Sequence, residues 1–89
     1  MLKIRQGFLL RQMMNAYVAV AVGEAGEDFN GMIRLNDAGA WLWKELQQGI
    51  DKDELVGKMC SRYEGLDEAT ARQDLEEFLL TVRFALEKE

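Results

Sequence analysis

From Phe8 to Leu35 the sequence has the pattern of strands: apolar positions alternate in the first segment, and a run rich in β-branched residues follows. It predicts a first strand at 8–11 and a second at 17–22, where β-branched valines are frequent. Residues 14–16 between them are few enough for a tight hairpin, in which Asn15 tolerates a positive φ at little cost. Residues 23–28 are polar and include two glycines, so we expect a loop before a third, shorter strand at Met32–Leu35.

After residue 35 the alternation gives way to the spacing of helices. Asn36 or its neighbour Asp37 can cap a first helix that stops at Gly49. The apolar residues of this helix are Ala40, Trp41, Leu42, Trp43 and Leu46. A second helix is expected after Asp51, which together with Glu54 resembles a capping box.

A third helix is expected after Asp67, and it should reach close to the C-terminus. One stripe of its surface holds Ala71, Leu75, Phe78, Val82 and Leu86. Three strands followed by three helices with short links indicate an α+β fold, with a three-stranded antiparallel sheet covered on one face by helices. Because 89 residues have too little interior for two cores, we expect a single domain over 1–89.

The charge of the chain is uneven along its length. Residues 1–35 hold four Lys and Arg against three Asp and Glu, whereas residues 36–89 hold seven against thirteen. Non-specific affinity for nucleic acid comes mainly from clustered basic residues that neutralise phosphates. An acidic second half therefore argues against a nucleic-acid partner.

Few catalytic or metal-binding residue types are present. The chain has no histidine and one cysteine, Cys60, so neither a zinc site nor a His-dependent triad can be assembled. The glycines match no nucleotide-binding loop, and we expect no cofactor. Two tryptophans, Trp41 and Trp43, point about 200° apart on a helix, so one should be buried and the other partly exposed. No apolar run is long enough for a signal peptide or membrane span, and we expect a cytoplasmic protein that is not an enzyme.

One segment resembles the central motif of the PqqD family. It runs from Asp28 to Asn36, through an asparagine-glycine pair and the third strand, and continues into the Ala38-Gly39-Ala40-Trp41-Leu42-Trp43 helix start. The opening strand, the loop at Val22-Gly23-Glu24 and the later helices follow in the order of the family. The resemblance covers nearly the whole chain.

The resemblance implies a winged-helix-like domain that binds peptides and does not catalyse. In that family a precursor's leader peptide lies antiparallel along the third strand, in the groove between this strand and the third helix. The leader is presented to a modifying enzyme, often a radical SAM enzyme, and PqqD itself serves the pyrroloquinoline quinone pathway. An exposed strand edge supports this mechanism physically, because a peptide can replace the water on its unpaired backbone groups.

Candidate peptide-binding residues follow from this mechanism. On the strand they are Met32, Ile33, Arg34 and Leu35. On the third helix they are Leu75 and the residues that flank one edge of its apolar stripe: Arg72, Glu76, Leu79 and Arg83. Other interpretations stay open: Leu79 as plain core, Arg72 and Arg83 as helix ion pairs with Glu76, and Arg34 as a charge that only deters aggregation.

Leu80 and Phe84 lie about 140° and 180° from Leu75 on the expected helix and would be exposed in a monomer. A homodimer through the third helix, or an enzyme partner, could cover them. Two alternatives to leader binding share the predicted shape: a winged-helix DNA-binding or transcriptional domain, and a structural subunit that docks on an enzyme without touching a peptide.

Overall fold

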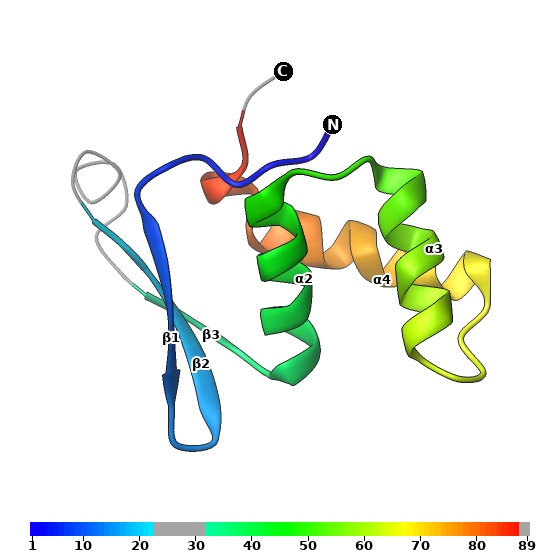
Figure 1. The fold of residues 1–89 in the computed structure, drawn as a ribbon, viewed down its shortest axis with the longest axis horizontal. Helices are drawn as coiled ribbons and strands as arrows, with labels where there is room; N and C mark the ends of the chain where they lie inside the picture. The colour runs from blue at the N-terminus through cyan, green and yellow to red at the C-terminus, as the bar shows by residue number, and fades with distance from the viewer. Residues whose placement is uncertain (23–31, 88–89) are drawn as a thin grey trace.

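The computed structural model describes residues 1–22 and 32–87 (Figure 1). Its elements in chain order are β1 (Phe8–Met13), β2 (Ala16–Ala21), β3 (Met32–Leu35), α2 (Asp37–Gln48), α3 (Lys52–Arg62), α4 (Glu68–Thr81) and a 3₁₀ helix, η1 (Arg83–Ala85). The sheet stands on one side, α2 lies between it and α3, and α4 passes behind them (Figure 1). The α+β fold is thus confirmed. The expected loop at residues 23–28 and the asparagine-glycine pair lie outside the described residues.

All three strands are antiparallel, and their order in the sheet is β1-β2-β3. A two-residue turn, Met14 and Asn15, joins β1 to β2. We expected a positive φ at Asn15, but in this turn it falls on Met14, with φ 50°. Because β2 is central, β3 forms one edge of the sheet among the described residues.

The core lies between the inner face of the sheet and the three helices. Trp43 is fully buried, and its ring meets Phe8 of β1 edge-on with 5.8 Å between ring centroids. Trp41 is partly buried, which confirms that the two tryptophans have different environments. Burying an aromatic side chain of this size contributes about 1.5 to 3 kcal/mol, so the Trp43 contact ties the sheet to α2.

The helix starts follow two of the three expected caps. Asn36 accepts a hydrogen bond from the Gly39 amide at 2.8 Å, and Asp67 accepts one from the Thr70 amide at 2.7 Å. The hydrogen bond from the Thr70 backbone lowers the pKa of the Asp67 carboxyl. Asp51 makes no capping hydrogen bond, so the expected capping box is wrong; its carboxylate lies 3.8 Å from the amino group at the N-terminus.

The expected third helix is shorter than its apolar stripe suggested. It ends at Thr81, and the chain turns at Val82 into the 3₁₀ helix η1. Phe84 therefore leaves the helical wheel and packs edge-on against Phe8, with 5.7 Å between centroids. The expectation that Phe84 is exposed was wrong, because it is partly buried against the core, whereas Leu80 is 64% exposed as expected.

The N-terminal residues explain this turn. Ile4 forms an antiparallel bridge with Leu86, and Leu2 forms one with Ile50. Ile4 is 4% exposed, so the first residues of the chain complete the core that a longer helix would have covered. None of the helices in the described ranges is both long and apolar enough to cross a bilayer.

Candidate functional site

The orientation of the backbone groups on β2 follows from its pairing with β1. The Val22 amide donates to the Gly7 carbonyl at 2.7 Å, so this pair is hydrogen-bonded across the two strands. In an antiparallel ladder every second residue turns its amide and carbonyl to the same side. The residues of β2 that face β1 are therefore Ala16, Val18 and Val20. Tyr17 and Ala19 face the other way, toward β3.

This alternation leaves two residues of β3 facing outward. Tyr17 and Ala19 pair with Leu35 and Ile33, so the backbone groups of these two residues of β3 are used within the sheet. Met32 and Arg34 turn their amides and carbonyls to the open side of the strand. Four backbone groups are thus available along the described edge for an added strand.

The side chains of β3 divide between two faces. Leu35 is 7% exposed and belongs to the core, and Ile33 packs against it. Met32, 64% exposed, and Arg34 point to the opposite face, which no described helix covers. A strand added beside β3 would place every second side chain on each of these faces.

A hollow of about 310 Å³ lies where β3 runs into α2, with α4 as its far wall. It is lined by Arg34, Leu35, Asn36, Ala38, Gly39, Leu42, Asp74, Phe78 and Thr81. Gly39 allows close packing there, since a β-carbon on it would lie 3.4 Å from the Phe78 ring and 3.3 Å from the Leu35 side chain. The hollow is mainly apolar, and Arg34, whose backbone groups face outward, is part of its lining.

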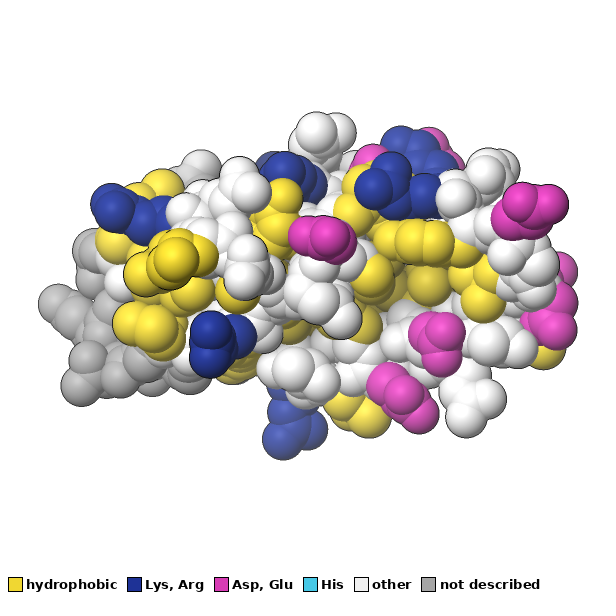
Figure 2. All heavy atoms as spheres, turned by 90° about the horizontal axis from the view of Figure 1, so that it is seen from below, with side chains coloured by type: hydrophobic (Ala, Val, Ile, Leu, Met, Phe, Trp, Pro, Cys, Tyr) yellow, Lys and Arg dark blue, Asp and Glu magenta, His cyan; other side chains and the backbone are white. Residues whose placement is uncertain are grey.

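Charged side chains are unevenly distributed over the molecule. Acidic side chains are most numerous toward the end where α3 and α4 lie, with basic side chains among them, whereas apolar and basic side chains occupy the sheet end (Figure 2). The three strands carry two charged residues, Arg11 and Arg34, both basic. Neither forms an ion pair with the residues of 1–22 and 32–87. The open edge is thus neutral to basic on an acidic protein.

A model of the family described as coenzyme PQQ synthesis protein D (PqqD) matches residues 12–83. The chain belongs to the PqqD family. This confirms the resemblance seen in the sequence. No curated protein matches the chain. TbiB1, solved in complex with the TbiA(beta) leader peptide, is 24% identical to this PqqD-family chain, covers 98% of it over 96% of its own length, and superposes with a TM-score of 0.77. This likeness shows a common fold.

In this PqqD-family chain two of the candidates on α4 face α3 and not β3. Arg72 donates to Asp53 at 2.8 Å and to Glu68 at 2.9 Å, and these hydrogen bonds raise the pKa of its guanidinium. Glu76 forms an ion pair with Lys52. Both partners outside α4 lie in the first turn of α3. The alternative interpretation in which Arg72 pairs with Glu76 is therefore wrong, and the two side chains hold α4 to α3.

The three remaining candidates of the expected third helix, Leu75, Leu79 and Arg83, also lie away from the hollow. Leu75 is fully buried, and Leu79 packs against the core. Arg83 belongs to η1, where it lines a separate hollow with Arg5 and Glu87. None of the five residues that we expected on this wall lines the hollow beside β3.

The wall of the hollow is formed by the opposite flank of the apolar stripe. Asp74, Phe78 and Thr81 recur at helical spacing there and face β3. Phe78 belongs to the predicted apolar stripe, whereas neither Asp74 nor Thr81 is among the predicted site residues. The aromatic Phe78 at the edge of the stripe is the one sequence signal that favours this flank.

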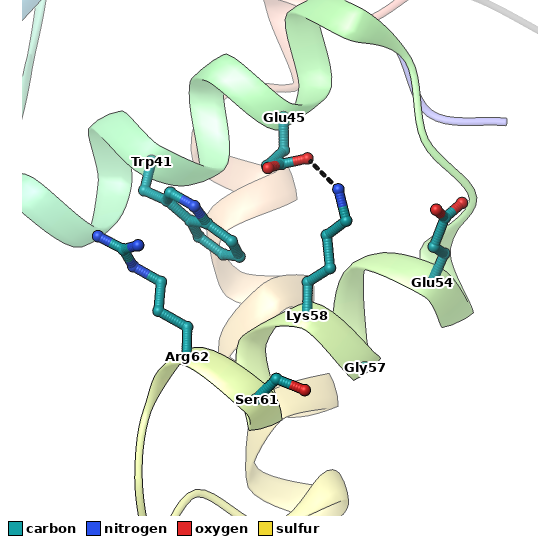
Figure 3. Close-up of a pocket in the computed structure, with 7 residues that line it drawn as sticks. All are labelled: Trp41, Glu45, Glu54, Gly57, Lys58, Ser61 and Arg62. Atoms are coloured by element: carbon teal, nitrogen blue, oxygen red, sulfur yellow. Dashed lines mark hydrogen bonds and ion pairs between the residues drawn. The ribbon is translucent and has the colours of Figure 1, made fainter.

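A larger hollow, about 780 Å³, lies between α2 and α3, away from the strand edge (Figure 3). Arg62 stacks over the Trp41 ring at 5.0 Å, and Lys58 pairs with Glu45 at 3.0 Å (Figure 3). Three of its polar residues, Glu45, Lys58 and Arg62, thus have partners within the chain. Because it touches no strand, it cannot serve strand addition.

Metal ligands are not brought together in the part of the chain that the structure describes: no group of three or more His, Cys, Asp or Glu lies close enough to hold an ion. Cys60 is partly buried and packs against the core. It thus occupies the position of a small apolar residue.

Proposed function

We propose that this chain binds the leader segment of a ribosomally made precursor peptide by strand addition at β3. The observation that carries the proposal is the open edge of β3 beside an apolar hollow whose wall is α4. Backbone pairing at such an edge accepts many sequences, and a neighbouring pocket selects among them. TbiB1, which shares the fold, was solved with a leader peptide bound, and this supports the same role here.

The energies agree with a site that needs both parts. Four new backbone hydrogen bonds, at Met32 and Arg34, contribute about 2 to 6 kcal/mol net. Micromolar affinity requires about 8 kcal/mol, before the cost of ordering the peptide. One apolar side chain buried against Phe78 adds about 1.5 to 3 kcal/mol. Edge and hollow together contribute about 3.5 to 9 kcal/mol, so only a well-fitting peptide that uses both reaches micromolar affinity, and neither part reaches it alone.

We further propose that the domain does not catalyse but presents the bound leader to a peptide-modifying enzyme, of which a radical SAM enzyme is the type implied by the resemblance. A strand held at an edge keeps its flanking residues free, so the segment to be modified can extend into a second protein. The domain would then raise the local concentration of substrate at that enzyme.

The test is a titration of the isotope-labelled chain with the leader of a precursor encoded beside its gene, followed by NMR. We expect the amide signals of Met32 and Arg34 to shift, with smaller shifts of Leu10 and Gln12, which have the same outward orientation on the opposite edge. If the domain only docks on an enzyme, the amides of β3 stay unmoved by the peptide. Shifts confined to β1 would place the peptide on the other edge and contradict the proposal.

A further inference from the structure

The outer face of the sheet, on the side away from α2, is arranged in rows across the three strands. Leu9, Val20 and Met32 lie in one row by the strand register. The next row holds Arg11, Val18 and Arg34. Each row ends at β3, so a strand added there extends both.

The second row has one buried member between two exposed ones. Val18 is 5% exposed although it does not belong to the main core cluster. It lies between the exposed residues Arg11 and Arg34 in the register, so their aliphatic stems are placed to cover it. Their guanidinium groups end in solvent without a described acidic partner. A carboxylate added to the end of this row would meet an unpaired positive charge.

The inner face imposes a different requirement one position away. Leu35 and Phe78 line the same hollow. In a strand added beside β3, the residue opposite Leu35 points its side chain to the same face as Leu35 does. This position is not hydrogen-bonded across the edge, since the backbone of Leu35 is turned to β2, and side chains of such pairs lie closer together. An apolar side chain is therefore favoured there.

We infer that the leader segment recognised at this edge carries an apolar residue followed directly by an acidic residue. The apolar residue lies opposite Leu35 and enters the hollow, and the acidic residue lies opposite Arg34 on the outer face. This order holds for a strand antiparallel to β3. Two residues after the acidic residue, the peptide position opposite Met32 extends the first row and should also be apolar. The inference rests on the proposed function and names the chemistry of its ligand.

The test is a displayed library of short random peptides, selected on the full chain. Selected peptides are aligned, and their contact with the edge is checked by the amide shifts of Met32 and Arg34. We expect enrichment of an apolar residue directly before Asp or Glu. In synthetic peptides from the selection, changing this Glu to Gln should weaken binding about two- to fivefold at low salt, the range of an exposed ion pair. The difference should shrink in about 1 M salt, where screening is nearly complete.

Two charge-reversal variants decide which arginine selects the acidic residue. Arg34→Glu should turn the preference from acidic to basic at the same position. Arg11→Glu is the matched control, because it lies in the same row on the far edge and should leave the preference unchanged. Both side chains are exposed, so both variants should fold.

Each outcome has one meaning. Peptides that shift the amides of β3 but show no acidic preference, or show the acidic residue before the apolar one, overturn the inference and leave leader binding intact. A preference that follows Arg11 and not Arg34 places the peptide on β1 and overturns both. If no selected peptide moves the amides of β3, strand addition itself fails.

Discussion

Proline substitutions at two adjacent positions distinguish the amides of β3 that face the open edge from those that face β2. Met32→Pro removes an amide that faces the open edge, and Ile33→Pro removes one that faces β2. Met32 is the first residue of an edge strand, a position in which proline is tolerated. The two changes have the same chemistry and differ in which side of the strand loses its donor.

The expected magnitudes follow from the environment of each amide. Met32 is 64% exposed and its amide is open to water, so Met32→Pro should change stability by no more than about 0.5 kcal/mol. Ile33→Pro leaves the carbonyl of Ala19, which is 2% exposed, without its partner and should cost about 1 to 3 kcal/mol, with the lost side-chain packing in addition. For peptide binding, the lost outward hydrogen bond of Met32→Pro should weaken affinity about 2- to 12-fold.

Chemical denaturation measures the stabilities, and titration calorimetry with the leader measures the affinities. Met32→Ala controls for the loss of the methionine side chain and should bind more tightly than Met32→Pro. If Met32→Pro unfolds the protein as readily as Ile33→Pro does, the assignment of outward amides is wrong. If Met32→Pro is stable but binds as the unsubstituted chain does, the peptide does not pair with this edge.

Three further predictions concern the fold around the site. Phe84→Ala should lower the free energy of unfolding by about 2 to 4 kcal/mol and Leu80→Ala by less than about 0.5 kcal/mol, because only Phe84 packs against the core; equal effects in urea denaturation would indicate that α4 continues through Phe84. Gly57→Ala should stabilise α3 by up to about 1 kcal/mol, since nothing lies within 4 Å of the added β-carbon, while Gly65→Ala should destabilise because its φ is 82°. The depressed pKa of Asp67 means that its cap stabilises α4 fully above about pH 4 and loses this effect as the pH falls, so the melting temperature should drop more steeply in acid than that of Asp67→Asn.

The sequence was sufficient for the strands and helices because their signals are local. Alternation and helical spacing each span a few residues, and Asn36 joins the end of β3 to the start of α2 with a cap that residue type alone suggests. The signal that ends α4 is not local. The apolar spacing continues through Val82 to Leu86, and the chain leaves the helix because Leu86 pairs with Ile4, more than 80 positions earlier. No pattern within the helix reports such a contact.

The wall of the hollow shows a second limit of local patterns. An apolar stripe tells which face of a helix is buried, but its two flanks are equivalent until neighbours are placed. Here α3 puts Lys52 and Asp53 against the flank of Arg72 and Glu76, which leaves the flank of Phe78 for β3. The open edge of β3 could be predicted because an edge is a property of strand order, whereas the helix residues that line the hollow depend on the path of the whole chain.

An open strand edge attracts other copies of the same protein as well as a ligand, and Arg34 bears on both. Edges of β3 from two copies, paired with each other, would bring two arginines near the same row, and like charges on facing strands are unfavourable. A peptide strand with an acidic residue opposite Arg34 would instead bring opposite charges together, which is favourable. The edge is also short, with two outward-facing residues among the four of β3. One exposed arginine in a strand otherwise without charge can therefore oppose pairing between copies and favour an acidic peptide, so that protection of the edge and selection of the ligand need no separate residues.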